Sequence, residues 1–106
     1  MTMKFKTIIF SKAPDAEPEI HRAVVESSLM KLFVQVVKTA DQAYDLARKL
    51  VAEEGLHSVL LCPGFSHAEV ARMQEAAGPT VSVSVARGDG PGNRVIAEVF
   101  RQVGWH

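Results

Sequence analysis

The 106-residue sequence contains one cysteine, Cys62, so a disulfide within the chain is excluded. Its longest apolar runs, Ile8–Phe10 and Val59–Cys62, are far shorter than the roughly 20 residues that span a bilayer. Charge of one sign is also lacking, because 12 Lys and Arg balance 12 Asp and Glu. General nucleic-acid binders need a basic face that displaces counterions from phosphates, so the neutral composition argues against that class.

The common catalytic and cofactor signatures are missing too. The sequence has no Cys-x-x-Cys, no Walker motif, no Gly-x-Ser-x-Gly elbow and no His-Glu-x-x-His, and Ser11–Pro14 stands where a dinucleotide fingerprint would be. No motif therefore indicates a cofactor. The first six residues lack the apolar run of a signal peptide, and we expect a cytoplasmic protein. A hydrophobic content of 47% fits one compact domain over residues 1–106.

The sequence predicts four strands that alternate with four helices. The strand-like segments are Phe5–Phe10, Leu32–Val37, Ser58–Cys62 and Thr80–Ala86. The predicted helices begin near Asp15 to Pro18 (with Ile20, Val24 and Val25 on one face), at the capping box Thr39/Gln42, at the capping box Ser66/Glu69, and near Val95. Gly55 and Gly78 end the second and third helices.

This alternation predicts a parallel sheet with right-handed crossovers. The strands that contain Ile8–Phe10 and Val59–Cys62 are apolar on both faces, as central strands are, whereas the strand with Gln35 and the Val/Ser strand resemble edges. We therefore expect a small flavodoxin-like or Rossmann-like three-layer α/β domain with four parallel strands in the order 2-1-3-4 and helices on both faces. Its switch point predicts a crevice between Ser11–Ala16 and Cys62–Ser66.

Cys62 is the candidate nucleophile, because a helix dipole at the end of its strand can activate a thiol. His67 or His21 could serve as its base in an enzyme that acts on an acyl or carbonyl substrate. The interpretation we favour for Cys62 is the last packed residue of a central strand, since free cysteine is among the most buried residue types, and for a histidine near a helix start it is a solvated surface residue. No pair among His21, Cys62, His67 and Asp89 has a recognised ligand spacing, so we expect no metal site.

A second site hypothesis is the binding of a small anion at the carboxyl ends of the strands. Gly88, Gly90 and Gly92 open the last helix, and free backbone N–H groups there could hold a phosphate or carboxylate. A Gly/Pro turn that caps this helix explains them equally well. The predicted ligand-binding residues are Lys12, Gly64, Phe65, Ser66, Arg87, Gly88, Asp89, Gly90, Gly92 and Asn93.

Three functions thus remain open: a small binding or regulatory domain for an anionic ligand, which we favour, a Cys62 enzyme, or a structural homo-oligomer. We also expect self-association, most simply as a dimer, and neither a nucleic-acid nor a membrane partner. The Val/Ser edge strand has no charge or proline to block pairing. In addition, one small core does not need all of the large apolar side chains of Leu29, Met30, Phe33, Phe100 and Trp105.

The order of motifs resembles an uncharacterised family of roughly hundred-residue bacterial α/β proteins, a domain of unknown function. The resemblance covers most of the chain and depends on Ala13–Arg22, Ala43–Gly55, Leu61–His67 and Val85–Gly92. It implies that six residues gather at one end of the sheet, namely His21, Cys62, Gly64, Phe65, Arg87 and Asp89. It implies no particular activity.

Overall fold

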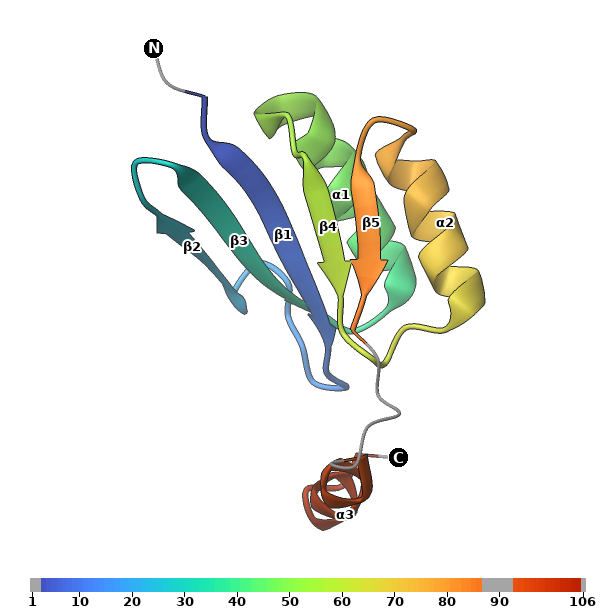
Figure 1. The fold of residues 1–106 in the computed structure, drawn as a ribbon. Helices are drawn as coiled ribbons and strands as arrows, with labels where there is room; N and C mark the ends of the chain where they lie inside the picture. The colour runs from blue at the N-terminus through green and yellow to red at the C-terminus, as the bar shows by residue number, and fades with distance from the viewer. Residues whose placement is uncertain (1–2, 87–92, 106) are drawn as a thin grey trace.

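The computed structural model describes residues 3–86 and 93–105, in which one mixed five-stranded sheet and three helices form an α/β fold (Figure 1). The strands are β1 (Phe5–Lys12), β2 (Arg22–Glu26), β3 (Met30–Val37), β4 (Ser58–Leu61) and β5 (Ser82–Val85). The helices are α1 (Ala40–Glu54), α2 (His67–Ala77) and α3 (Asn93–Gln102). The strand order is β2-β3-β1-β4-β5, and all neighbours are parallel except β2 and β3.

The predicted order of the four parallel strands is confirmed, since β3-β1-β4-β5 is the order 2-1-3-4 of the sequence prediction. The two doubly apolar strands, β1 and β4, are interior strands, and the Val/Ser strand β5 is an edge. The switch point between β1 and β4 therefore lies where the sequence places it.

The predicted first helix, with Ile20, Val24 and Val25 on one face, is wrong. This part of the chain forms β2, an antiparallel partner of β3 in which Val24 lies opposite Phe33 and Val25 opposite Leu32. Consecutive β-branched residues favour a strand. The turn that joins the two strands is also locally encoded, because Ser27 Oγ accepts the N–H groups of Leu29 at 3.3 Å and Met30 at 3.1 Å.

The strand with Gln35 is not an edge, because β2 lies outside it. Gln35 is only 5% exposed, and its Nε2 donates to the carbonyls of Pro18 at 2.9 Å and Val36 at 3.0 Å. The loop before β2 thus provides hydrogen-bond acceptors for the polar side chain that makes this strand resemble an edge in the sequence.

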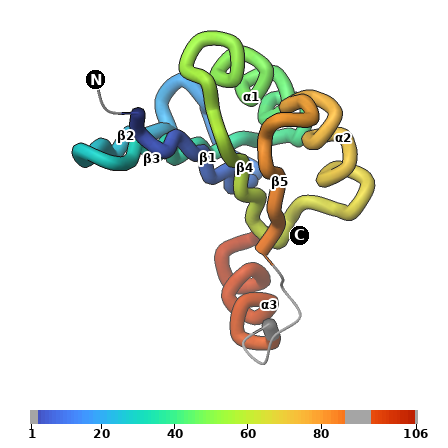
Figure 2. Tube along the Cα trace, turned by 45° about the horizontal axis from the view of Figure 1, so that its top comes forward, coloured from blue at the N-terminus to red at the C-terminus, as the bar shows by residue number. Residues whose placement is uncertain are grey.

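Helices α1 and α2 both pack on the same face of the sheet, which we call the covered face (Figures 1 and 2). Each begins at the predicted capping box, at Thr39 and at Ser66, and α1 ends at Gly55, whose φ of 73° is left-handed. The core on this face is made of fully buried strand residues that contact the helices, chiefly Ile8, Phe10, Val37, Val59 and Leu61.

The sequence predicts helices on both faces of the sheet. This prediction is wrong for α1 and α2, because both helices lie on the covered face. In the predicted fold, the connection between β1 and β3 is the helix that covers the other face. Here that connection is a loop followed by β2, and the loop lies beside α1 on the covered face, where both line one hollow. The opposite side of the sheet, which we call the open face, therefore receives no helix from this connection.

The open face carries an apolar patch. Strand alternation places on it the residues that follow or precede the buried core positions, and the pairing register brings five of them together. We call Ile9, Val25, Leu32, Val34 and Leu60 the open-face patch. Val25 is 60% exposed and the other four are half-buried, and none of the five belongs to the core cluster.

Helix α3 lies beyond the carboxyl ends of the parallel strands, away from α1 and α2 (Figures 1 and 2). All of its side chains from Arg94 to Gln102 are exposed. Helical spacing gathers Val95, Ile96, Val99, Phe100 and, just after the helix, Val103 on one side, and we call these residues the α3 stripe. Among the described residues, no helix has the length and apolarity needed to cross a membrane.

Candidate functional site

The sequence-predicted site at the carboxyl ends of β1 and β4 is organised around Lys12. Its Nζ lies 2.9 Å from Glu69 Oε1, 3.3 Å from the carbonyl oxygen of Gly64 and 4.6 Å from the centre of the Phe65 ring. The structure thus brings together the end of β1, the loop after β4 and the start of α2. Lys12 and Gly64 show that Ser11–Ala16 and Cys62–Ser66 lie next to each other, and the crevice expected between them stays a prediction.

Glu69 has a structural role that sequence reasoning identified only in part. Its Oε1 accepts the Ser66 backbone N–H at 2.8 Å, while Ser66 Oγ accepts the Glu69 N–H at 3.2 Å. The bond from the Ser66 N–H, followed by that from Lys12, lowers the pKa of Glu69 below its usual value of 4.5. The same Glu69 carboxylate thus takes part in the capping box, which the sequence predicts, and in the ion pair with Lys12, which only the fold brings about.

This network changes the character of the predicted anion site. The Lys12 ammonium donates to a carboxylate and a carbonyl, so its charge is paired within the chain. The positive end of α2 is likewise partly used by Glu69. The arrangement fixes α2 against β1, and it offers an incoming anion less than a free lysine would.

Cys62 lies one residue beyond β4 and is half-buried. Its backbone N–H donates to the Phe10 carbonyl at 3.1 Å and its carbonyl accepts the Phe65 N–H at 3.2 Å, so the backbone at this position is held in place by β1 and the following turn. Phe65 is buried beneath this turn, while Gly64, Ser66 and His67 are exposed. His67 is the first residue of α2, as predicted.

The two candidate bases of Cys62 differ in position. His21 precedes β2 and lies in a turn in which its Nδ1 accepts the Glu17 N–H at 2.9 Å and its carbonyl accepts the Val36 N–H at 2.9 Å. Three strand spacings, about 14 Å, separate the positions of β2 and β4 in the sheet. The fold therefore does not bring His21 to Cys62. In residues 3–86 and 93–105, no hydrogen bond joins the Cys62 thiol to His67, and the Cys62 enzyme stays a hypothesis.

The rest of the predicted ligand loop lies outside the described residues. This applies to Arg87, Gly88, Asp89, Gly90 and Gly92, while Asn93 is described as the first residue of α3. Within the described part of the chain, no group of three or more His, Cys, Asp or Glu side chains is arranged to hold a metal ion.

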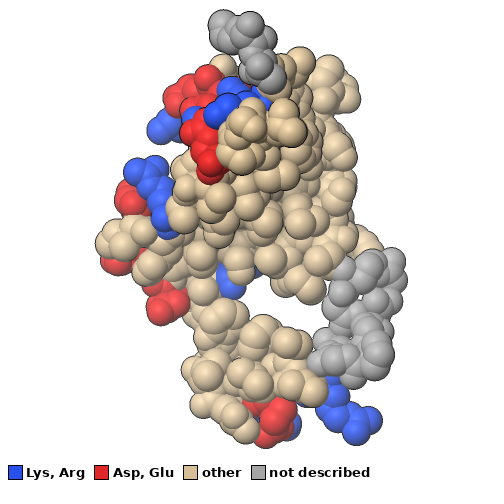
Figure 3. Space-filling view, turned by 60° about the vertical axis from the view of Figure 1, so that its left-hand side comes forward, with Lys and Arg blue, Asp and Glu red and all other residues tan. Residues whose placement is uncertain are grey.

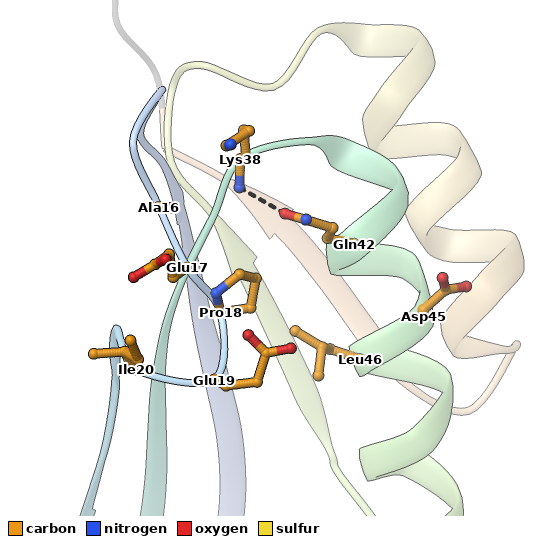
Figure 4. Close-up of a pocket in the computed structure, with 9 residues that line it drawn as sticks. All are labelled: Ala16, Glu17, Pro18, Glu19, Ile20, Lys38, Gln42, Asp45 and Leu46. Atoms are coloured by element: carbon orange, nitrogen blue, oxygen red, sulfur yellow. Dashed lines mark hydrogen bonds between the residues drawn. The ribbon is translucent and has the colours of Figure 1, made fainter.

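Three surface hollows of about 460, 470 and 640 Å³ lie elsewhere on the described chain. The first lies between the loop 16–20 and α1, where Pro18 and Glu19 of the loop face Leu46 of the helix, while the side chains of Glu17 and Ile20 point away from α1 (Figure 4). The largest lies between the β2–β3 hairpin and α1, above Phe33 and Leu50. Neither Cys62 nor His67 lines any of these three.

Charge is distributed unequally between the two faces of the sheet. The five charged strand residues all lie on the covered face by alternation and register: Lys6, Lys12, Arg22, Glu26 and Lys31. Lys6 Nζ donates to the Glu54 carbonyl at 2.7 Å and Lys31 pairs with the Glu54 carboxylate at 3.1 Å, which ties both lysines to the end of α1. Figure 3 shows the result, a broad surface free of Lys, Arg, Asp and Glu beside the charged rim.

Comparison with known proteins identifies a family to which the chain is similar. The model of a family of unknown function, DUF6506, matches residues 3–101. The chain belongs to this family. No curated protein and no solved structure matches it. Membership in DUF6506 confirms the resemblance seen in the sequence, and it assigns no activity.

Proposed function

We propose that this member of DUF6506 is a self-associating binding domain and that the open face of its sheet is the association surface. The supporting observation is the distribution of charge between the faces. An antiparallel or mixed sheet with one face in water normally carries its polar residues on that face. This sheet has every charged strand residue on the side of the helices and the open-face patch on the other side.

The residues that surround the open-face patch also suit burial. The neighbouring positions on β1, β4 and β5 are small hydroxyl residues: Thr7, Ser58, Ser82 and Ser84. Burying such a surface removes apolar area from water and requires no charged group to lose its hydration. The neutral chain also adds little repulsion between copies.

The test is the mass in solution, measured by light scattering over a range of concentrations. We expect a multiple of the 11.6 kDa chain mass for the wild type and a shift to the monomer for Leu32→Lys, which places a charge in the open-face patch. The matched control, Ala52→Lys, adds the same charge at an exposed position of α1 and should leave the mass unchanged. Specific associations commonly have dissociation constants near or below about 1 μM. A wild type that keeps a mass of 11.6 kDa up to a concentration of about 100 μM would therefore contradict the proposal.

A second proposal is that a small anion binds at the start of α2. The observation that favours it is that the capping box uses the N–H groups of Ser66 and Glu69, while those of His67 and Ala68 belong to the first turn, where helical N–H groups have no intrahelical acceptor. Titration with sulfate, followed by amide NMR, tests it. The shifts should concentrate at His67 and Ala68, and equal shifts at Ala40 and Asp41, the same positions of the similarly capped α1, would indicate only weak nonspecific binding.

A further inference from the structure

Two apolar surfaces of this chain lie uncovered at the same time. One is the open-face patch on β1, β2, β3 and β4, and the other is the α3 stripe. The stripe residues are between 40% and 63% exposed, which is unusual for five large apolar side chains on one side of one helix. Amphipathic helices of this kind normally bury their apolar side against another element.

We infer that the α3 stripe of one copy packs on the open-face patch of a second copy, and that the second copy returns the same contact. The inference rests on the proposed function and names the segment that occupies the association surface. The resulting dimer has two-fold symmetry, in which each chain supplies a helix and receives one. It gives the sheet a helical layer on its open face and thereby completes the three-layer architecture that the α/β pattern of the chain favours.

The dimensions of the two surfaces agree. A helix of ten residues is about 15 Å long and about 10 Å wide with its side chains. Four strands spaced about 4.8 Å apart make a surface about 14 Å across, and the strands of the patch are long enough to lie under such a helix. One α3 helix therefore fits the open-face patch.

The charges agree as well. The polar and charged residues Arg94, Glu98 and Arg101 lie on the side of α3 away from the stripe by helical spacing. A helix docked through its stripe keeps these three side chains in water, while the charged residues of the described strands all lie on the covered face and not on the open face beneath the helix. No ion is stripped of its hydration by the contact.

The position of α3 favours a second copy as the partner over the chain's own sheet. In this structure α3 lies beyond the carboxyl ends of the strands with its stripe exposed, so the chain's own helix leaves the patch bare (Figures 1 and 2). A helix that projects from the domain in this way can reach a neighbouring molecule, and exchange of identical elements is a low-cost route to a dimer.

A charge in the stripe provides the first test. Val99→Lys should weaken the dimer at least tenfold, measured as the dissociation constant from light scattering or sedimentation. Ala97→Lys, on the opposite side of the same helix, is the control and should leave the constant within about twofold. Because α3 is exposed in the single chain, both variants should retain the far-ultraviolet circular dichroism of the wild type.

Cross-linking between two different single variants provides the second test. Leu60→Cys and Val99→Cys, each in a Cys62→Ala background, are mixed, with one of them labelled with ¹⁵N, and treated with a short bis-maleimide. We expect a covalent product with one labelled and one unlabelled chain. Replacing Val99→Cys by Ala97→Cys, which turns the thiol away from the sheet, should abolish it.

The outcomes separate the inference from the proposed function. A dimer that survives Val99→Lys, or that links only Leu60→Cys to Leu60→Cys, means that two sheets meet directly; it overturns the exchange of α3 and leaves self-association intact. A double variant, Leu60→Cys with Val99→Cys in the same Cys62→Ala chain, is treated in parallel. If it cross-links only within one chain while the mixed single variants give no product, α3 covers its own sheet, and this also overturns the inference. A monomer at every concentration overturns both.

Discussion

The two faces of the sheet differ most clearly at two consecutive residues of β4. Leu61 is fully buried in the core cluster that α1 and α2 complete, whereas Leu60 lies on the open face, half-buried and outside that cluster. The two residues are both leucine, and they differ only because successive side chains of a strand point to opposite faces of the sheet. Apolar residues on both faces of β1 and β4 therefore indicate two faces to be covered, and the described chain covers one of them.

The comparison also explains the distribution of charge. On the covered face, lysines near the strand ends form ion pairs with Glu54 of α1 and Glu69 of α2. These ion pairs help to hold the helices on the sheet. The open face has no layer of that kind and no charged strand residue. Its composition is that of an interior surface, which is why we assign its cover to another molecule.

The largest expected difference between the faces is in stability. Leu61→Ala should lower the free energy of unfolding by about 2–5 kcal/mol, because it opens a cavity in the packed core. Leu60→Ala should cost about 1 kcal/mol in dilute protein, because its side chain loses less contact. Urea unfolding at low micromolar concentration measures both. Equal costs would mean that the open face is already covered within one chain.

Thr39→Ala should have the next largest effect. It removes the hydroxyl that accepts the Gln42 N–H and so loosens the first turn of α1, the longer of the two covering helices, by about 1 kcal/mol. Thr80→Ala, at an exposed position between α2 and β5, is the control and should change stability by less than about 0.5 kcal/mol. Thermal unfolding is a suitable measurement. A neutral Thr39→Ala would mean that packing on the sheet, rather than the cap, determines where α1 begins.

Gly55→Ala tests the other end of α1. Gly55 has φ of 73°, and a left-handed residue with a Cβ costs about 1 kcal/mol. Gly64, whose backbone lies outside that region and whose Cβ position is open, is the matched control, and Gly64→Ala should be nearly neutral. Similar losses from the two variants would contradict the assignment of Gly55 as the residue that ends the helix.

The smallest expected effect is a dependence of stability on pH. The folded-state pKa of Glu69 lies below its unfolded value, so its contribution is present above the unfolded pKa and is lost as pH falls through the folded one. Chemical unfolding between pH 7 and 3 should therefore show a shallower loss for Glu69→Gln than for the wild type. Glu75→Gln, on the exposed side of α2, should follow the wild type. If the Glu69→Gln curve parallels the wild-type curve instead, neither the Ser66 N–H nor Lys12 stabilises the ionised carboxylate of Glu69 in the folded state.

Local signals predicted the parts of the fold that depend on them. The capping boxes at Thr39 and Ser66 and the doubly apolar strands around Ile9 and Leu60 fixed α1, α2, the order of the parallel strands and the position of the switch point, because caps and burial patterns act over a few residues. The segment from Ile20 to Val25 could not be predicted in this way. Its apolar positions fit one helical face while its consecutive β-branched residues favour a strand, so the local signals conflict, and the pairing with β3 decided for the strand.

At the candidate site, the sequence by itself determined which residues stand at the ends of β1 and β4, from Lys12 to Ser66, because chain direction alone brings the carboxyl ends of parallel strands to one edge. Only the tertiary structure decided what Lys12 does there, since its partner Glu69 belongs to another element and an ion pair depends on distance. The exposure of the open face likewise depends partly on the sequence and partly on the tertiary structure. The sequence determined that Ile9 and Leu60 are apolar. Whether a helix lies over them depends on the segment between β1 and β3, and this segment forms the edge strand β2 rather than a helix.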